Sequence, residues 1–288
     1  MGTSNLMTSN LTQQAKALLF YELHHSGRML ILPNIWDPLG ALLLESIGYP
    51  AIATASAAIA YTNGYDDGEQ MPFDSVLERL NAITHCVNLP VTADIESGYA
   101  TTNSRLRENI KSLIDTGIVG INFEDSDKQS GLLIPVNIQS ERINLVREVA
   151  NESGIRLFIN ARTDVYIKGT DFDDNGKLLE TIKRGRAYLD AGADCIFPIA
   201  VKQIDHIREL TSNIAAPINI LAIPGVPDFK KLNDLGVARV SLGPGFLKIA
   251  VSALKNFAES LRNFEGMDEI TNNEISSEYL KNLVNIKK

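Results

Sequence analysis

The chain repeats one local pattern four times, and this repeat limits the folds open to it. The end of an amphipathic helix is followed by a glycine and then by a short apolar run, as in "IDTGIVGINFED" and "NDLGVARVSLGP". A glycine in this place suits the left-handed backbone that commonly ends a helix. Each copy is therefore predicted to be a junction between a helix and a strand. The four glycines are Gly48, Gly117, Gly192 and Gly236.

Further short apolar runs raise the number of expected strands to eight. They cover residues 29–34, 89–94, 155–162 and 218–224, and the segments between strands are long enough for helices. Strands that alternate with helices predict a parallel sheet buried on both faces. Eight such units in 288 residues predict a (β/α)8 barrel of the TIM type. An open doubly wound sheet is the alternative, but no G-x-G-x-x-G follows the first strand.

The composition is that of a globular protein, with 44% hydrophobic and 22% charged residues. We expect residues 1–262 to form a single barrel domain. Residues 263–288 are polar and contain one more helical segment, "SSEYLKNLV". This C-terminal extension is expected to pack on the barrel or on a neighbouring subunit.

The net charge of −8 argues against a nucleic acid or an anionic membrane surface as the main partner. No apolar stretch approaches the roughly 18 residues of a membrane span. The N-terminal segment "MGTSNLMTSNLTQQ" lacks the basic and apolar regions of a signal peptide. Two cysteines suit a reducing compartment, so the expected location is the cytoplasm.

Carboxylates gather where the expected strands end. Asp94 and Glu96 follow the third strand, Glu124 ends the fourth, and Asp67 lies in the loop after the second. In a parallel barrel these positions share the carboxyl edge, and on an extended segment Asp94 and Glu96 share a face. Like charges at close range disfavour ionisation unless something neutralises them. The residues alone leave a metal, a basic side chain or water as the neutralising partner.

A hard divalent cation would relieve this repulsion, and Mg²⁺ suits carboxylate oxygens, with Mn²⁺ as an alternative. The predicted metal residues are Asp94, Glu96 and Glu124. Asp125 and Asp164 also end strands, and the alternatives for them are helix caps or supports for the metal ligands.

Two further groups suit an anionic substrate. Arg162 follows the fifth strand beside acids, where a guanidinium can bind a carboxylate or phosphoryl group bidentately; an ordinary surface arginine is the alternative. The small residues Thr54, Ala55 and Ser56 end the second strand. Their hydroxyl and backbone N–H groups suit a carboxylate or an enolate oxygen, although a packing seam would use the same residues.

Several motifs in order resemble the isocitrate lyase and phosphoenolpyruvate mutase superfamily over residues 15–262. They are "LPNIWDPLGALLLESIGYPAIATAS", "GYDDGEQMP", "ADIESGYA", "GINFEDS", "INARTD" and "AGADCIFP". The resemblance implies a barrel that exchanges its last helix with a neighbouring subunit in homodimers or homotetramers. It also implies Mg²⁺ and a small 2-oxo or 2-hydroxy carboxylate that reacts next to an enolpyruvate-like oxyanion.

The resemblance also implies roles for individual residues. Asp94 would bind the metal directly, while Glu96 and Glu124 would act through metal-bound waters. The expected catalytic residues are Arg162, Asp67 and Lys128. The expected substrate-binding residues are Thr54, Ala55, Ser56, Arg162 and Asn219.

The chain departs from its relatives in the loop after the fourth strand. Isocitrate lyases carry a Cys and a His there, but this chain reads "EDSDKQSGLLIPVN" and offers Lys128 instead. It also has Ile199 where those lyases have Glu, and the Lys–Asn pattern of the mutases is missing. We expect a Mg²⁺-dependent lyase that cleaves a C–C bond in a small 2-oxo or 2-hydroxy di- or tricarboxylate. The alternatives are P–C bond chemistry, as in a phosphonomutase or phosphonopyruvate hydrolase, and a non-catalytic 2-oxo acid binding protein.

Overall fold

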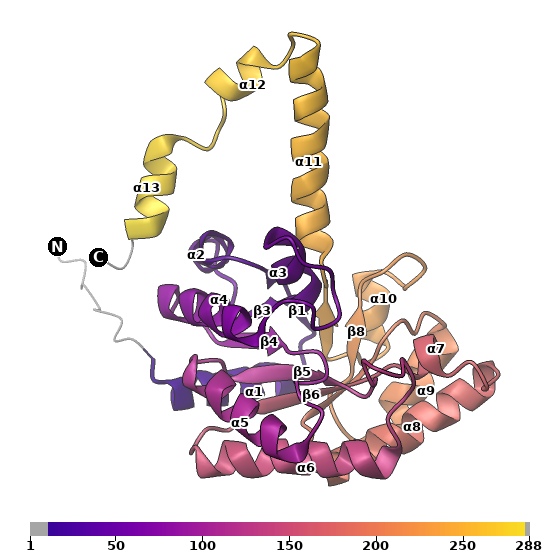
Figure 1. Ribbon diagram of the computed structural model, residues 1–288. Helices are drawn as coiled ribbons and strands as arrows, with labels where there is room; N and C mark the ends of the chain where they lie inside the picture. The colour runs from indigo at the N-terminus through magenta and orange to yellow at the C-terminus, as the bar shows by residue number, and fades with distance from the viewer. Residues whose placement is uncertain (1–10, 286–288) are drawn as a thin grey trace, which may run out of the picture.

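Short parallel strands form the centre of the molecule (Figure 1). The computed structural model describes residues 11–285. Its strands are β1 (Leu30–Leu32), β2 (Asn34–Ile35), β3 (Ile52–Thr54), β4 (Val91–Asp94), β5 (Gly120–Glu124), β6 (Phe158–Thr163), β7 (Cys195–Pro198), β8 (Asn219–Leu221) and β9 (Arg239–Ser241).

The strands follow one another around a barrel. β2 to β7 pair in chain order, and β8 pairs with β9, which pairs with β1. A parallel bridge between Ile196 and Ile218 joins β7 to the segment before β8. At the other end of the series only Pro33 separates β1 from β2, and proline has no N–H for the ladder. The expected first strand is therefore present as β1 and β2, and the expected α/β barrel is confirmed.

The helices alternate with the strands as the sequence predicts. They are α1 (Gln13–His25), α2 (Pro38–Ser46), α3 (Ser56–Thr62), α4 (Phe73–Cys86), α5 (Asn103–Asp115), α6 (Val136–Glu152), α7 (Val165–Lys168), α8 (Asp174–Asp190), α9 (Ile204–Asn213), α10 (Phe229–Asp234), α11 (Gly245–Arg262), α12 (Met267–Thr271) and α13 (Ser277–Asn285).

The glycines of the repeated junction have the left-handed conformation that the sequence predicts. Their φ angles are 85° at Gly48, 91° at Gly117, 107° at Gly192 and 79° at Gly236. A side chain would strain this backbone, so glycine ends the helix and turns the chain into the next strand.

Helix α1 covers the barrel at the amino-terminal ends of β5 and β6 (Figure 1). Phe20 is fully buried there, and its ring centroid lies 5.2 Å from that of Phe158. A Cβ added at Gly120 would lie 3.0 Å from Phe20 Cε1, so the glycine makes room for this ring. The opposite end of the barrel remains for the functional residues.

The C-terminal segment leaves the barrel. Helix α11 projects away from it and has no buried residue, and the chain then returns through α12 to α13 (Figure 1). Leu283 of α13 is 4% exposed and packs in a cluster with residues of α2. Residues 1–10 and 286–288, the outer ends of the two expected units, lie outside the described residues, as does most of the N-terminal segment examined for a signal. No helix within residues 11–285 has the length and apolar character needed to span a membrane.

His24 of α1 provides a test of this packing, because it is buried in the neutral form. Its ring stacks on Phe158 at a centroid distance of 4.1 Å, and Nδ1–H donates to the Phe20 carbonyl at 2.8 Å. Burial and, second, the charge of Arg239 lower the pKa of His24 to about 3.

Acid should destabilise the protein through His24. Below the unfolded pKa of about 6.5, His24 is protonated in the unfolded state but stays neutral in the folded state. The free energy of unfolding therefore decreases as the pH is lowered. His24→Phe should remove about 2 kcal/mol of this loss between pH 6.5 and pH 5. Urea unfolding at both pH values measures it, with the exposed neighbour His25→Phe as the control. Equal acid sensitivity of the wild type and His24→Phe would contradict the assignment.

Candidate active site

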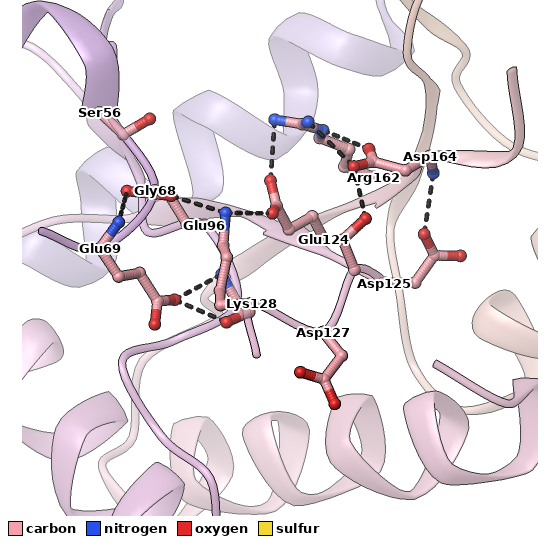
Figure 2. A network of polar contacts seen from close by, with 12 residues as sticks. Ser56, Gly68, Glu69, Glu96, Glu124, Asp125, Asp127, Lys128, Arg162 and Asp164 are labelled. Carbon is pink, nitrogen blue, oxygen red and sulfur yellow. Dashed lines mark hydrogen bonds and ion pairs between the residues drawn. The ribbon is translucent and has the colours of Figure 1, made fainter. Parts of the chain in front are cut away.

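The acidic residues predicted at the strand ends meet at the carboxyl edge of the barrel (Figure 2). Asp94 is the last residue of β4, and Glu124 is the last residue of β5. Glu124 stands opposite Arg162 of β6 in the parallel register. Thr54 ends β3 on the other side of β4. The fold thus gathers predicted site residues from four consecutive strands.

A lysine neutralises two of these acids. Lys128 Nζ lies 2.7 Å from Glu96 Oε2 and 2.5 Å from Glu124 Oε1 (Figure 2). Burial works against the charged form, yet Glu124 and Glu96 raise the pKa of Lys128 above its usual value. Burial also raises the pKa of both glutamates, and the lysine opposes that rise. A basic side chain is therefore the partner that the structure shows for this pair.

Arg162 neutralises the remaining charge on the same side of the site. Its Nη1 lies 2.8 Å from Glu124 Oε2, and its Nε lies 2.7 Å from Asp164 Oδ1. Burial disfavours the cation, but the charges of Glu124 and Asp164 raise the pKa of Arg162 overall. The arginine is thus not an ordinary surface residue, and any anionic ligand would share it with two carboxylates.

The backbone at Glu96 differs from the expected one. β4 ends at Asp94, and Glu96 has a φ of 52°, so the extended segment that would place both acids on one face is wrong. Glu96 nevertheless reaches the site, because its Oε1 accepts a hydrogen bond of 2.9 Å from the Glu69 N–H. At 4% exposure the residue is firmly enclosed, which offsets the strain of a left-handed non-glycine residue.

Glu69 organises this loop, a role that the sequence did not reveal. Its Oε1 accepts hydrogen bonds from Ser97 N–H at 2.9 Å, Ser97 Oγ at 2.6 Å and Tyr99 N–H at 3.1 Å. One carboxylate therefore holds the turn after β4, while its own N–H holds Glu96. Glu69 lies in the acidic loop "GYDDGEQMP", where its sequence context does not distinguish it from a candidate metal ligand.

Asp94 and Asp67 form no ion pair within residues 11–285. Asp94 Oδ2 accepts hydrogen bonds from Ser56 Oγ at 2.9 Å and from Ser56 N–H at 3.4 Å. Burial and then the charge of Asp94 raise the pKa of Asp67, while the charges of Lys128 and Arg162 oppose that rise. These two carboxylates are therefore the acids of the site that lack a direct ion pair among the described side chains.

Asp94 and Asp67 are the acids of this site that could hold a magnesium ion. Mg²⁺ binds one or two protein carboxylates and fills its octahedron with waters and substrate oxygens. Asp94 with Asp67 nearby offers such a set, whereas the oxygens of Glu96 and Glu124 already face cations. Over the described range 11–285, no three Asp, Glu, His or Cys side chains converge as ligands of one ion. Any ion held by Asp94 and Asp67 would therefore take most of its ligands from water or substrate, unlike the ion of a closed zinc site.

The small residues after β3 lie beside Asp94. Ser56 begins α3 and contacts Asp94, and Ala55 is the residue before the helix. Thr54 is fully buried, and its Oγ1 accepts a hydrogen bond of 3.2 Å from the Asp94 N–H. Thr54 thus aligns β3 with β4, while its predicted contact with substrate stays a prediction.

Asn219 lies inside the barrel, next to an arginine that sequence reasoning missed. Its Nδ2 donates to Ser241 Oγ at 3.0 Å, and Arg239 Nε donates to the same oxygen at 3.1 Å. Arg239 is fully buried, and its Nη2 reaches Asn122 Oδ1 at 3.3 Å. Burial lowers the pKa of Arg239 to about 10, and the charges of Cys195 and Asp94 oppose this change. A charged residue in the apolar run "VARVSLGP" was the available signal.

Comparison with known proteins agrees with this geometry. The family model described as phosphoenolpyruvate phosphomutase matches residues 20–262. The chain belongs to this family, within the phosphoenolpyruvate mutase and isocitrate lyase superfamily.

Members of the superfamily with different names are similar to this chain. An uncharacterised protein of Mycobacterium tuberculosis is 34% identical over 78% of this chain and 81% of its own length. A 2-methylisocitrate lyase of Bacillus subtilis is 25% identical over 86% and 82%. An oxaloacetate decarboxylase of Pseudomonas fluorescens is 25% identical over 91% and 89%. Membership therefore leaves the substrate open.

Solved structures of the superfamily share the fold. A Burkholderia cenocepacia protein described as a phosphonomutase is 38% identical and has a TM-score of 0.81, covering 85% of this chain and 99% of its own. A phosphonopyruvate hydrolase in complex with oxalate and Mg²⁺ has a TM-score of 0.82 at 22% identity, covering 96% of each chain. The latter shows the shared fold alone.

A buried hydrogen-bond network centred on Asp125 holds the residues that position Arg162. Asp125 is fully buried, and its Oδ2 accepts hydrogen bonds from Arg184 Nη1 at 2.9 Å and Tyr188 Oη at 2.7 Å. Its Oδ1 accepts one from the Asp164 N–H at 2.8 Å, and Asp164 in turn holds Arg162. Neither Asp125 nor Asp164 caps a helix with its side chain. Of the two alternatives predicted for them, helix caps or supports for the site residues, their contacts favour the second.

Arg184→Met should destabilise the protein strongly, because it leaves Asp125 buried without its counter-ion. The expected loss is about 3–5 kcal/mol of unfolding free energy, measured by chemical denaturation. The neighbouring Lys183→Met is the control. Lys183 pairs with Glu180 at 3.1 Å and is 67% exposed, so its loss should cost less than about 1 kcal/mol. Similar losses in both variants would contradict the role of Arg184.

Proposed function

We propose that this chain is a Mg²⁺-dependent enzyme that cleaves a C–C bond in a small 2-oxo or 2-hydroxy carboxylate. The observation that carries the proposal is the pair Asp94 and Asp67, which form no ion pair within residues 11–285, beside the cations Arg162 and Lys128. Such a site attracts a hard dication and an anionic ligand together. When bound, Mg²⁺ would polarise the 2-oxo or 2-hydroxy oxygen and stabilise developing enolate charge.

The residues of the chain would carry out the remaining tasks. Asp94 would hold the ion, while Glu96 and Glu124 would orient its waters. Arg162 would bind a substrate carboxylate, which would share the guanidinium with Glu124 and Asp164. Lys128 brings a proton-bearing side chain into a loop that has no Cys or His, and it would supply the proton that the enolate carbon needs after cleavage.

P–C bond chemistry is the second candidate, and one finding favours it. The 38% identical protein from Burkholderia cenocepacia is described as a phosphonomutase. Both reactions pass through an enolpyruvate-like oxyanion, so the same Asp94 region would serve either.

Assays with Mg²⁺ should separate these candidates. We expect turnover of oxaloacetate, methylisocitrate or dimethylmalate, followed by release of pyruvate or oxalate. Release of phosphate from phosphonopyruvate, or its isomerisation to phosphoenolpyruvate, would favour the second candidate. Silence on all four compounds, with Mg²⁺-dependent oxalate binding intact, would favour a non-catalytic binding protein and overturn the enzyme proposal.

Asp94→Ala should abolish metal-dependent ligand binding, because Asp94 is proposed as the direct ligand of Mg²⁺. Calorimetry with oxalate measures this, with and without Mg²⁺. Asp205→Ala removes a highly exposed acid on α9 and should bind oxalate as the wild type does. Unchanged binding by Asp94→Ala would refute the metal assignment.

The projecting helix α11 is consistent with the expected oligomer, in which neighbouring subunits exchange their last helix. Its exposed apolar side chains include Ile249 at 68% and Leu254 at 69% exposure. Isolated chains rarely leave such a helix uncovered. We propose that α11 packs against a second copy of the chain, in exchange for the same helix of that copy.

Leu254→Glu should weaken this association, because it places a charge in the apolar contact. Analytical ultracentrifugation should show a shift toward monomer in Leu254→Glu. Ser252→Glu adds the same charge on the opposite side of α11 and should leave the oligomer intact. A wild-type protein that is monomeric at micromolar concentration would refute the proposal.

A further inference from the structure

Lys128 occupies the oxygens that would face a bound metal. Its Nζ lies 2.7 Å from Glu96 Oε2 and 2.5 Å from Glu124 Oε1, and both carboxylates are almost fully buried. The chain thus supplies a cation of its own to two of the three residues predicted for the metal (Figure 2).

This lysine lies on a hairpin whose base and tip are held differently. At the base, Ser126 bridges to Leu133, and the Ile134 N–H donates to the Asp125 carbonyl at 2.8 Å. The Arg184 guanidinium also donates to the Ile134 carbonyl at 2.9 Å. Both ends of the hairpin are therefore fixed to the buried network.

The tip, residues 127–132, is bonded mainly to itself. Asp127 Oδ1 accepts hydrogen bonds from Gln129 N–H at 2.7 Å and Ser130 N–H at 3.1 Å. The Asp127 N–H donates to the Leu132 carbonyl at 2.9 Å. The ion pairs of Lys128 are what join this tip to β5 and to the loop after β4.

We propose that the Lys128 ammonium and a divalent cation compete for Glu96 and Glu124, so that metal binding releases the tip of the hairpin and frees the ammonium for the proton transfer proposed above. The inference rests on the metal-dependent function proposed above and adds a regulation of that site. Two cations drawn to the same oxygens repel each other at short range. A ligand that favours one of two arrangements shifts the population toward it, and the competing arrangement lowers the apparent affinity.

The remaining charges explain why the exchange is feasible. When Lys128 leaves, Glu124 keeps Arg162 at 2.8 Å, and Glu96 keeps the Glu69 N–H at 2.9 Å. Asp94 and Asp67 lack an ion-pair partner in residues 11–285 even with Lys128 in place, so a dication gains attraction there before it displaces the lysine. The lysine is thus a competitor at part of the site and no replacement for the metal.

Mn²⁺ binding tests the competition without any assay of activity. Electron paramagnetic resonance of free Mn²⁺ gives the affinity of the wild type, Lys128→Met and the control Lys183→Met. Lys128→Met removes the ammonium and keeps an apolar stem of similar length. We expect it to bind Mn²⁺ about tenfold more tightly, within the usual range of coupling between sites. Lys183→Met, with the same change of net charge, should bind as the wild type does.

Chemical labelling of the wild type tests the release of the hairpin. An N-hydroxysuccinimide ester acylates accessible lysines, and mass spectrometry follows Lys128 with Lys183 as the internal reference. Mn²⁺ should increase the labelling rate of Lys128 several-fold and leave that of Lys183 unchanged. In Asp94→Ala the Mn²⁺ effect should vanish. This measurement needs no substitution at Lys128, so it decides the matter even if Lys128→Met does not fold.

The outcomes distinguish the two proposals. Asp94-dependent Mn²⁺ binding that is equal in the wild type and Lys128→Met, with unchanged labelling, overturns the competition and leaves the proposed function standing. Absence of Mn²⁺ binding in both proteins overturns the metal-dependent function and the competition with it. Binding by Lys128→Met alone would support a competition so strong that the lysine excludes the ion.

Discussion

The balance of charge at the carboxyl edge of the barrel is the constraint on which the rest of the site depends. Glu96, Glu124 and Asp164 are each at most a few per cent exposed, so their charges need partners within the protein. Lys128 pairs with Glu96 and Glu124, and Arg162 pairs with Glu124 and Asp164. Asp94 and Asp67 remain outside this arrangement. The position of the cations thus decides where the site is still electronegative.

The sequence predicts the fold well because its signals are local. A left-handed glycine between a helix and an apolar run depends on a few adjacent residues, and Gly48, Gly117, Gly192 and Gly236 all have the expected φ. The eight strands follow from the same short-range pattern. The details are predicted less well, because Pro33 removes a donor and divides the first strand, and Glu96 departs from the expected extended backbone after β4.

The site is predicted only in part, because its partners are distant in sequence. Strand ends place Asp94, Glu124 and Arg162 together by topology alone. The contact between Lys128 and Glu96 depends instead on the conformations of two loops, one of which holds a left-handed glutamate. The periodic pattern of apolar residues in the sequence does not predict such loop conformations.

Closure of the barrel hides a second group of residues from sequence reasoning. Arg239 meets Asn122 across 117 positions of sequence, and only the closed ring of strands brings them within 3.3 Å. In the strand itself, arginine in an apolar run reads as an interruption of the pattern. Its buried hydrogen bonds with Ser241 and Asn122 show instead a polar group inside the barrel, and Asn122 is the register partner of Asp94.

The hairpin after β5 has a base fixed to the buried core and a tip held by ion pairs. Its base belongs to the rigid core, because Arg184 binds both Asp125 and the Ile134 carbonyl. Its tip depends on two ion pairs at one ammonium, whose strength changes with any other cation nearby. A charge that enters beside Asp94 would therefore act on the tip and leave the base in place. The support that Asp125 gives to Arg162 through Asp164 does not depend on this tip.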